Sequence, residues 1–135
     1  QDDWENWTKL NKAIGSQVQI VGDDLLVTSI KKIKTSISKN SANTVLIKPN
    51  QIGTISETLN AINFAHKNNL NTIISHRSGD TEDSFIADLA IGTQATQLKS
   101  GAPARSERTA KYNRISEIIS QNKKINYLGF QAMKI

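Results

Sequence analysis

The segment at residues 44–76, TVLIKPNQIGTISETLNAINFAHKNNLNTIISH, decides the fold expected for this chain. It begins with a short apolar run at 44–47 and ends with another at 72–74, and both runs are too short for helices. Between them, apolar residues recur at helical spacing: Ile55, Leu59, Ile62 and Ala65. Thr54 and Glu57 form a capping box that predicts the start of this helix. The segment therefore predicts a strand–helix–strand unit with parallel strands.

The same alternation continues on both sides of this unit. Two further short runs, 18–21 and 95–98, are predicted to be buried strands. Amphipathic patterns predict four more helices, at about 3–14, 30–37, 85–92 and 106–120. Alternating strands and helices indicate an α/β fold with a parallel sheet and right-handed crossovers.

Local signals suggest how these helices begin, end and face the core. Gly15 is expected to end the first helix as its C′ residue. Asp80 or Thr81 is expected to lie near the start of the helix at 85–92. In the last helix, four apolar residues are expected to point inward: Ala110, Ile115, Ile118 and Ile119.

Composition narrows the classes of function. The chain has 135 residues, 17 Lys and Arg against 12 Asp and Glu, and no cysteine, which excludes disulfides and thiolate metal sites. The net charge of +5 fits an anionic metabolite or nucleic acid, but aromatic residues make up only 5%, which argues against base stacking. No apolar stretch approaches the roughly 18 residues of a membrane span. The first residue, Gln1, indicates a processed or partial chain.

Charged or polar residues follow each predicted strand. Parallel strands end at the same edge of a sheet, and in β/α barrels ligands bind at the carboxyl ends of the strands. One such residue is usually a solvated strand exit, but groups after four successive strands are expected to converge on an anionic ligand. These residues are Asp23 and Asp24, Lys48, His76 with Arg77 and Ser78, and Lys99.

Four stretches resemble the enolase family, in order and over nearly the whole chain. They are VGDDL (21–25), VLIKPNQIGTISET (45–58), SHRSGDTEDSFIADLAIG (75–92) and LKSGAPARSERTAKYN (98–113). The resemblance implies parallel β/α units that form roughly the last half of a TIM-type barrel. Residues 1–135 would then be the C-terminal half of the barrel domain, without the N-terminal domain and the first half of the barrel.

The resemblance also implies a reaction, the reversible dehydration of 2-phosphoglycerate to phosphoenolpyruvate with Mg²⁺, a cytoplasmic step of glycolysis. Members of the enolase superfamily use a Lys or His residue as the base, together with Mg²⁺. By resemblance, Lys48 is the catalytic base, and Asp23 is a Mg²⁺ ligand that also faces the substrate. Asp24 does not bind the metal itself but orients the residues that do.

Substrate binding is implied for the remaining strand-end residues. Lys99 would hold the substrate carboxylate, while Arg77 and Ser78 would bind the phosphate. Ser75 and His76 belong to the same substrate-binding segment.

The family places its other metal carboxylates, its general-acid glutamate and its closing loops in the N-terminal part of the protein. The 135-residue chain alone is therefore expected to be inactive, with the N-terminal part of an enolase as its partner. The family also implies a homo-oligomer, although the stretch 117–120 departs from the family pattern near that contact. Neither nucleic acid nor a membrane is an expected partner.

Two alternatives remain open at this stage. The chain could be a stand-alone, non-catalytic fragment that binds a partner or an anionic ligand, or a nucleic-acid-binding fragment supported by charge alone. Outside the strand ends, His66 is expected to be solvated, and Trp4 and Trp7 to pack in the core or between helices. Three acidic residues are expected to serve as N-terminal charge for the following helix: Asp80, Glu82 and Asp83.

Overall fold

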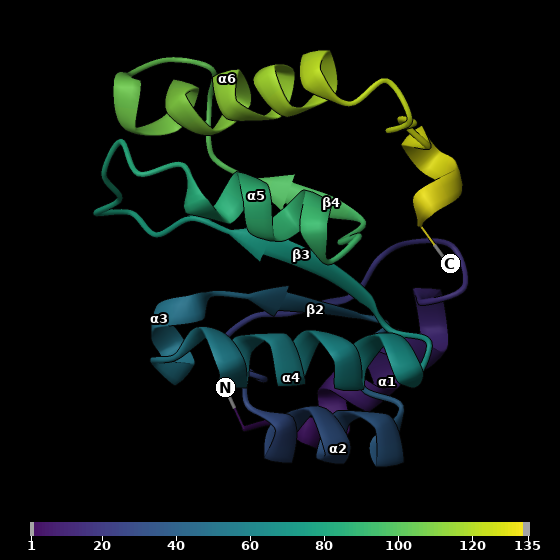
Figure 1. Cartoon of the computed structure of the whole chain (residues 1–135). Coiled ribbons are helices and arrows are strands. Elements are labelled where there is room, and N and C mark those ends of the chain that lie inside the picture. The colour runs from purple at the N-terminus through teal and green to yellow at the C-terminus, as the bar shows by residue number, and fades with distance from the viewer. Residues whose placement is uncertain (1, 134–135) are drawn as a thin grey trace.

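The computed structural model describes residues 2–133. In chain order, its elements are α1 (Trp4–Ile14), β1 (Val21–Gly22), α2 (Ile30–Lys39), β2 (Thr44–Ile47), α3 (Pro49–Ile52), α4 (Ile55–Lys67), β3 (Asn71–Ser75), α5 (Phe85–Gly92), β4 (Gln97–Lys99), α6 (Ser106–Gln121) and a 3₁₀ turn, η1 (Gly129–Ala132). Figure 1 shows these elements along the chain.

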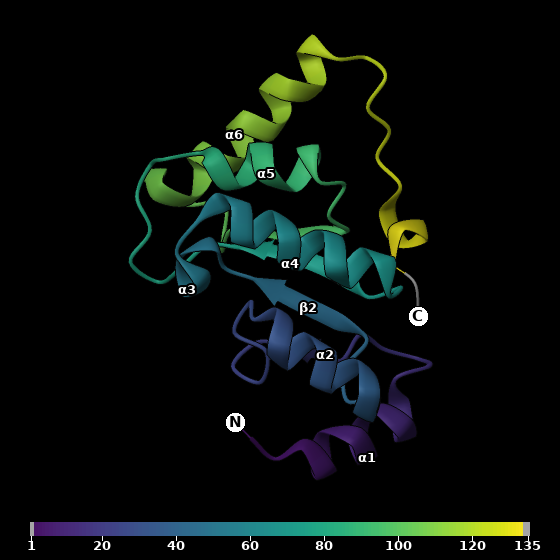
Figure 2. The same ribbon diagram turned by 60° about the horizontal axis from the view of Figure 1, so that its bottom comes forward.

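The strands form one parallel sheet in the order β1-β2-β3-β4. Strands adjacent in sequence are thus adjacent in space, as expected when helices connect parallel neighbours. Helices α2, α4 and α5 follow one another across the same side of the sheet, and α6 lies beyond α5 (Figure 2). The predicted α/β class with a parallel sheet is confirmed.

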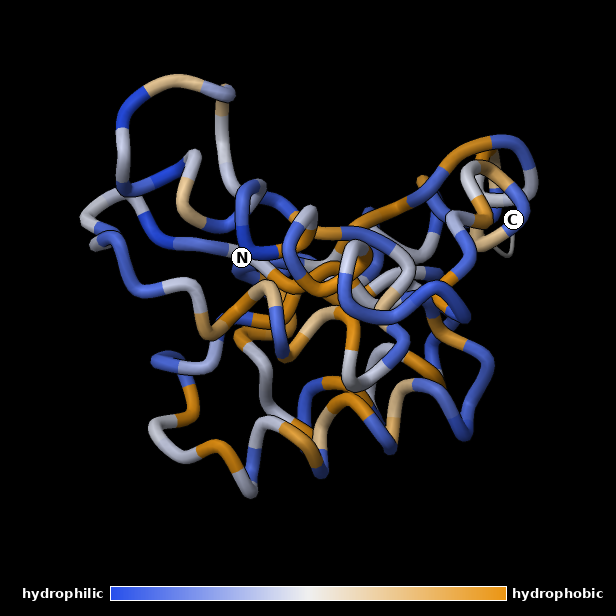
Figure 3. Tube along the Cα trace, turned by 45° about the horizontal axis from the view of Figure 1, so that its top comes forward, coloured by the Kyte–Doolittle hydropathy of each residue, from blue (hydrophilic) through white to orange (hydrophobic). Residues whose placement is uncertain are grey.

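The hydrophobic core lies between the sheet and these helices. Val45, Ile47 and Ile74 point into it from β2 and β3, and they meet Ile33 of α2 and Ile62 of α4, all at 0% exposure. In Figure 3 the hydrophobic parts of the trace gather toward the middle of the molecule. Burial of this apolar surface is the main force that holds the helices on the sheet.

The outer strands begin later than the sequence predicted. The expected strand at 18–21 is wrong in position, because Val18 is 43% exposed and only Val21 and Gly22 are strand. The Asn43 side-chain amide donates to the carbonyls of Gly15 and Val18. These side-chain hydrogen bonds hold the segment that precedes β1.

The last strand spans Gln97–Lys99 instead of 95–98. The Ala95 N–H donates to the carbonyl of Ala90, and Ala95 therefore still belongs to the exit from α5. Apolar periodicity detected both outer runs but could not show where the hydrogen-bonded ladder starts.

Two predictions about helix ends can be compared with the structure. Thr54 is the N-cap of α4, as predicted, and its hydroxyl accepts from the Glu57 N–H at 3.2 Å. Gly15 ends α1, as predicted, and it does so as the C-cap in a right-handed conformation. A Cβ there would lie 2.3 Å from Asn11 Oδ1, so Gly15 supplies space.

The prediction that Asp80 or Thr81 starts α5 is wrong. Ser84 is the N-cap of that helix. The Asp83 carboxylate accepts from the Phe85 N–H at 2.8 Å, which satisfies one of the free donors of the first turn. The intervening residues instead form the loop that leaves β3.

Three further expectations concern side-chain burial. Ile119 is 44% exposed, so its inward assignment is wrong, whereas Ala110, Ile115 and Ile118 are half-buried. His66 is not simply solvated, because it is half-buried and its Nε2 lies 2.8 Å from the Thr72 hydroxyl. Trp4 and Trp7 pack against the core, as expected.

After α6 the chain returns toward the amino ends of the strands (Figures 1 and 2). There the Gln97 side-chain amide donates to the Met133 thioether sulfur at 3.0 Å. Within residues 2–133, no helix combines the length and the apolar character that crossing a membrane requires.

Candidate active site at the carboxyl edge of the sheet

Strand register places Lys48, Ser75 and Lys99 in one row at the carboxyl edge of the sheet. Ile47 pairs with Ile74, and Ser75 pairs with Lys99, so Lys48 follows at the level of Ser75. Residues paired across parallel strands point to the same face, and adjacent strands lie about 4.8 Å apart. The two lysines therefore flank Ser75 on the face that the helices leave free.

A cleft of about 460 Å³ lies over this row. Its volume is in the usual range for a small-molecule site. Its walls are basic or hydroxyl-bearing, which suits an anion with several oxygen atoms. The residues that line it are Lys48, His76, Arg77, Ser78, Lys99 and Arg108.

Asp23 forms an ion pair with Lys48. Asp23 Oδ1 lies 2.6 Å from Lys48 Nζ, and the lysine side chain is 13% exposed while that of Asp23 is 36% exposed. The contact joins the carboxyl ends of β1 and β2, so it places a carboxylate beside the basic cleft. Asp24, the next residue, is exposed.

The backbone of Lys48 is held by buried Thr28. The Thr28 hydroxyl accepts from the Lys48 N–H at 3.0 Å and donates to Gln51 Oε1 at 2.8 Å. Val27 and Thr28 both have positive φ, 42° and 57°, a costly conformation for β-branched residues. The strained turn thus fixes the peptide that carries Lys48.

Arg77 lies at the exposed mouth of the cleft, on the loop after β3. Its Nη1 donates to Asn50 Oδ1 at 2.9 Å, and its backbone N–H donates to Asp80 Oδ2 at 3.3 Å. Ser78 is exposed beside it. The buried Ser75 hydroxyl donates to the carbonyl of His76 at 2.9 Å, which orients the start of this loop.

His76 is half-buried, and its pKa is lowered from 6.5. Burial is the largest cause, the Asp80 carboxylate acts in the opposite direction, and the positive charges of Lys99, Arg108 and Lys111 lower the pKa further. Near neutral pH, the imidazole therefore offers an uncharged donor and acceptor to the cleft.

Gly101 has a φ of 79° and lies beside both Arg108 and His76, two residues that line the cleft. A Cβ at this position would lie 2.9 Å from Arg108 Cδ and 3.2 Å from His76 Cε1. Glycine thus meets both the backbone and the space requirement.

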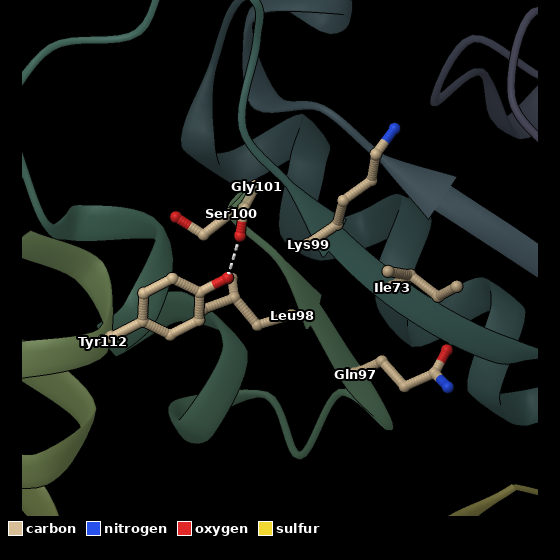
Figure 4. Close-up of a pocket in the computed structure, with 7 residues that line it drawn as sticks. All are labelled: Ile73, Gln97, Leu98, Lys99, Ser100, Gly101 and Tyr112. Atoms are coloured by element: carbon tan, nitrogen blue, oxygen red, sulfur yellow. Dashed lines mark hydrogen bonds between the residues drawn. The ribbon is translucent and has the colours of Figure 1, made fainter. Parts of the chain in front are cut away.

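A second hollow, of about 490 Å³, lies along β4. In Figure 4, Lys99 extends from β4 away from Tyr112, whose hydroxyl donates to the carbonyl of Gly101. Lys99 lines both hollows, so the two are neighbours along the outer strand.

Asp23 offers a hard oxygen donor of the kind that Mg²⁺ prefers. Within residues 2–133, no group of three or more His, Cys, Asp or Glu side chains could hold a metal ion. Asp23 is therefore suited to bind a metal ion, but the described residues do not contain a complete set of such ligands.

The structure brings together most of the residues that the sequence singled out. Lys48 and Lys99 share the cleft with the 76–78 loop, Asp23 contacts Lys48, and Ser75 lies in the row between the lysines. Sequence reasoning missed Arg108, Asn50, Thr28 and Lys111. Arg108 lies within the stretch 98–113 that carries the resemblance, but it was not predicted to reach the cleft.

Comparison with known proteins identifies close relatives. Residues 1–135 match a family model described as "Enolase, C-terminal TIM barrel domain". Enolase from Elusimicrobium minutum is 50% identical over 135 residues, 99% of this chain and 32% of the relative. Enolases from Campylobacter lari and Helicobacter pylori (strain HPAG1) are 54% and 52% identical over 96% and 99% of this chain. The chain spans about a third of the length of these curated relatives.

Proposed function

Because this chain belongs to the enolase family, through the C-terminal TIM-barrel domain, we propose that it supplies the base-bearing half of an enolase active site. Its four parallel strands form part of that barrel. The proposed reaction is the reversible dehydration of 2-phosphoglycerate to phosphoenolpyruvate, a glycolytic step for which we propose a cytoplasmic location. The observation that carries this proposal is the cleft that joins Lys48, Lys99 and the 76–78 loop.

Lys48 is proposed to remove the proton from the substrate carbon next to the carboxylate. Its side chain is mostly buried, follows the end of β2 and lines the cleft in which the substrate would lie. The Thr28 contact fixes the peptide of Lys48, which restricts where that amine can reach. A positioned base of this kind contributes about 10²–10⁴-fold to the rate.

The other cleft residues are proposed to bind the substrate's anionic groups. Lys99 holds the carboxylate, and Arg77 and Ser78 hold the phosphate at the cleft mouth. Ser75 and His76 support this segment, with the neutral imidazole as a hydrogen-bonding group. Arg108, which also lines the cleft, adds a positive charge to the same wall. Bidentate contacts from arginine suit a phosphate.

Asp23 is proposed to be one ligand of Mg²⁺. Asp24 is proposed to orient the site without binding the metal. When bound, Mg²⁺ supplies positive charge that stabilises developing negative charge on substrate oxygens. In that state Asp23 would share its oxygens between the metal and Lys48. The carboxylate thereby couples the position of the base to the metal site.

We propose that residues 1–135 form a half-barrel domain that works with the N-terminal part of an enolase. The free edges of β1 and β4 favour this, since exposed sheet edges are generally covered or paired. The remaining metal ligands and the general acid would come from that part, and a homo-oligomer of the complete protein follows the family.

A non-catalytic role that only binds an anion is the second candidate, and titration with 2-phosphoglycerate separates the two. We expect amide NMR signals of Lys48, the 76–78 loop and Lys99 to shift together at millimolar ligand. If only the loop responds, the cleft binds phosphate groups without orienting a substrate over Lys48. Shifts confined to other parts of the chain would contradict the proposed site.

A further inference from the structure

Lys111 is the one fully buried lysine among the described residues, with 0% exposure. It lies on α6, a helix that otherwise has no buried residue. Burying an amine away from water is unfavourable unless its hydrogen-bonding capacity is satisfied. The surroundings of Lys111 therefore indicate what holds it in place.

Three oxygen atoms surround Lys111 Nζ, which matches the three N–H donors of a protonated lysine. Nζ donates to the backbone carbonyls of Thr81 and Glu107, the latter at 2.6 Å, and lies 3.4 Å from Asp80 Oδ1. Glu107 belongs to the same helix, whereas Asp80 and Thr81 belong to the loop between β3 and α5. Lys111 thus ties that loop to α6.

Asp80 extends this link to the proposed phosphate-binding turn. Its Oδ1 accepts from the Thr81 N–H at 2.9 Å, and its Oδ2 accepts from the Arg77 N–H at 3.3 Å. The carboxylate therefore closes the turn that contains Arg77 and Ser78, and Lys111 holds the carboxylate. Residues 76–84 form no helix or strand of their own, so these contacts define much of the loop's shape.

We propose that Lys111 is a positioning residue that acts through Asp80 to hold the Arg77–Ser78 turn ready for an anion. The inference rests on the proposed function, which makes that turn the phosphate site. It adds a residue from the outer helix, one that lies outside the lining of the cleft. A lysine that only attached α6 to the core would instead make its contacts with residues of the sheet or of α5.

The test compares the wild-type chain with Lys111→Met, which keeps the length of the side chain but removes its donors. Lys67→Met, at an exposed site on α4, is the matched control. Amide hydrogen exchange is measured at Arg77 and Thr81, and inorganic phosphate is titrated by NMR. We expect Lys111→Met to speed exchange of these two amides about tenfold or more, because a charge-assisted anchor is lost. Phosphate affinity should fall about tenfold.

Steady-state kinetics of a complete barrel, with and without the Lys111→Met change, measure KM and kcat separately. A purely structural role of Lys111 would not change KM selectively. Lys111→Met should raise the KM for 2-phosphoglycerate more than it lowers kcat, because the loss is in substrate binding. If the variant does not fold, Asp80→Asn replaces it, since this change removes the negative charge on the other side of the Lys111–Asp80 ion pair. Protection of the Ile74 amide reports whether each variant retains the sheet.

The outcomes separate the two proposals. Unchanged exchange at Arg77 and Thr81 in a folded variant would overturn the role of Lys111. Wild-type phosphate affinity despite faster exchange would also overturn it, since the turn would then need no anchor. If wild-type chain shows no phosphate response at the turn, the proposed anion site fails, and the exchange rates alone decide whether Lys111 anchors the loop.

Discussion

Lys48 Nζ and Asp23 Oδ1 lie 2.6 Å apart, so the proposed base is paired with the proposed metal ligand. The contact holds the amine of Lys48 against the carboxylate at the carboxyl ends of β1 and β2. In the function proposed above, the carboxylate that orients Lys48 would also be the one that binds Mg²⁺, so the position of the base depends on Asp23.

Lys48→Ala should remove the first chemical step while leaving substrate binding largely intact. In a complete barrel that contains this chain, exchange of the substrate α-proton with deuterated solvent should fall by about 10²–10⁴-fold, the contribution of a positioned base. Lys99→Ala is the comparison, and it should also raise KM because the carboxylate contact is made before the reaction. Near-normal proton exchange in Lys48→Ala would transfer the role to another strand-end group, with His76 tested first.

The 135-residue chain alone should form no measurable phosphoenolpyruvate, even with excess Mg²⁺. The described residues contain no cluster of three or more acidic, His or Cys metal ligands. Adding the N-terminal two thirds of the Campylobacter lari relative should restore turnover, and Asp23→Asn in this chain should prevent the restoration. Turnover by the chain without a partner would refute the half-site assignment.

The titration of His76 should occur below pH 6.5 in the folded chain, because burial lowers its pKa. The unfolded chain then binds more protons just below that pH, so this group's contribution to stability is complete above pH 6.5 and declines as the pH falls. Imidazole NMR signals measure the midpoint directly. Asp80→Asn should lower it further, since that carboxylate opposes the shift. A midpoint above 6.5 would show that burial is not the dominant influence.

Thr28→Val should destabilise the chain, because it leaves the Lys48 N–H and the Gln51 side chain without their partner. A buried unsatisfied group costs about 1–3 kcal/mol in the free energy of unfolding, measured by urea titration. Thr35→Val is the control, since the Thr35 hydroxyl donates to the Lys31 carbonyl within α2 and contacts no residue of the cleft among those described. We expect the control to change stability by less than about 0.5 kcal/mol. Equal effects of the two substitutions would mean that the Thr28 contact has no special importance.

The sequence by itself determined the parallel α/β architecture and the residues at the ends of the strands. Periodicity was sufficient because apolar spacing separates helices from strands, and parallel strands bring their carboxyl ends to one edge. The resemblance to enolases then supplied roles for Lys48 and the 76–78 loop. Strand boundaries at 18–21 and 95–98 were misjudged, because hydrogen-bond pairing depends on neighbours that the local pattern does not contain.

Only the tertiary structure revealed the support behind the site. Thr28 reaches Lys48 across 20 positions, and Lys111 reaches Asp80 and Thr81 across about 30. Neither side chain has a local pattern that distinguishes it from an ordinary helical lysine or loop threonine. Their burial and partners arise when separate β/α units pack together, so long-range packing decides what local spacing leaves open.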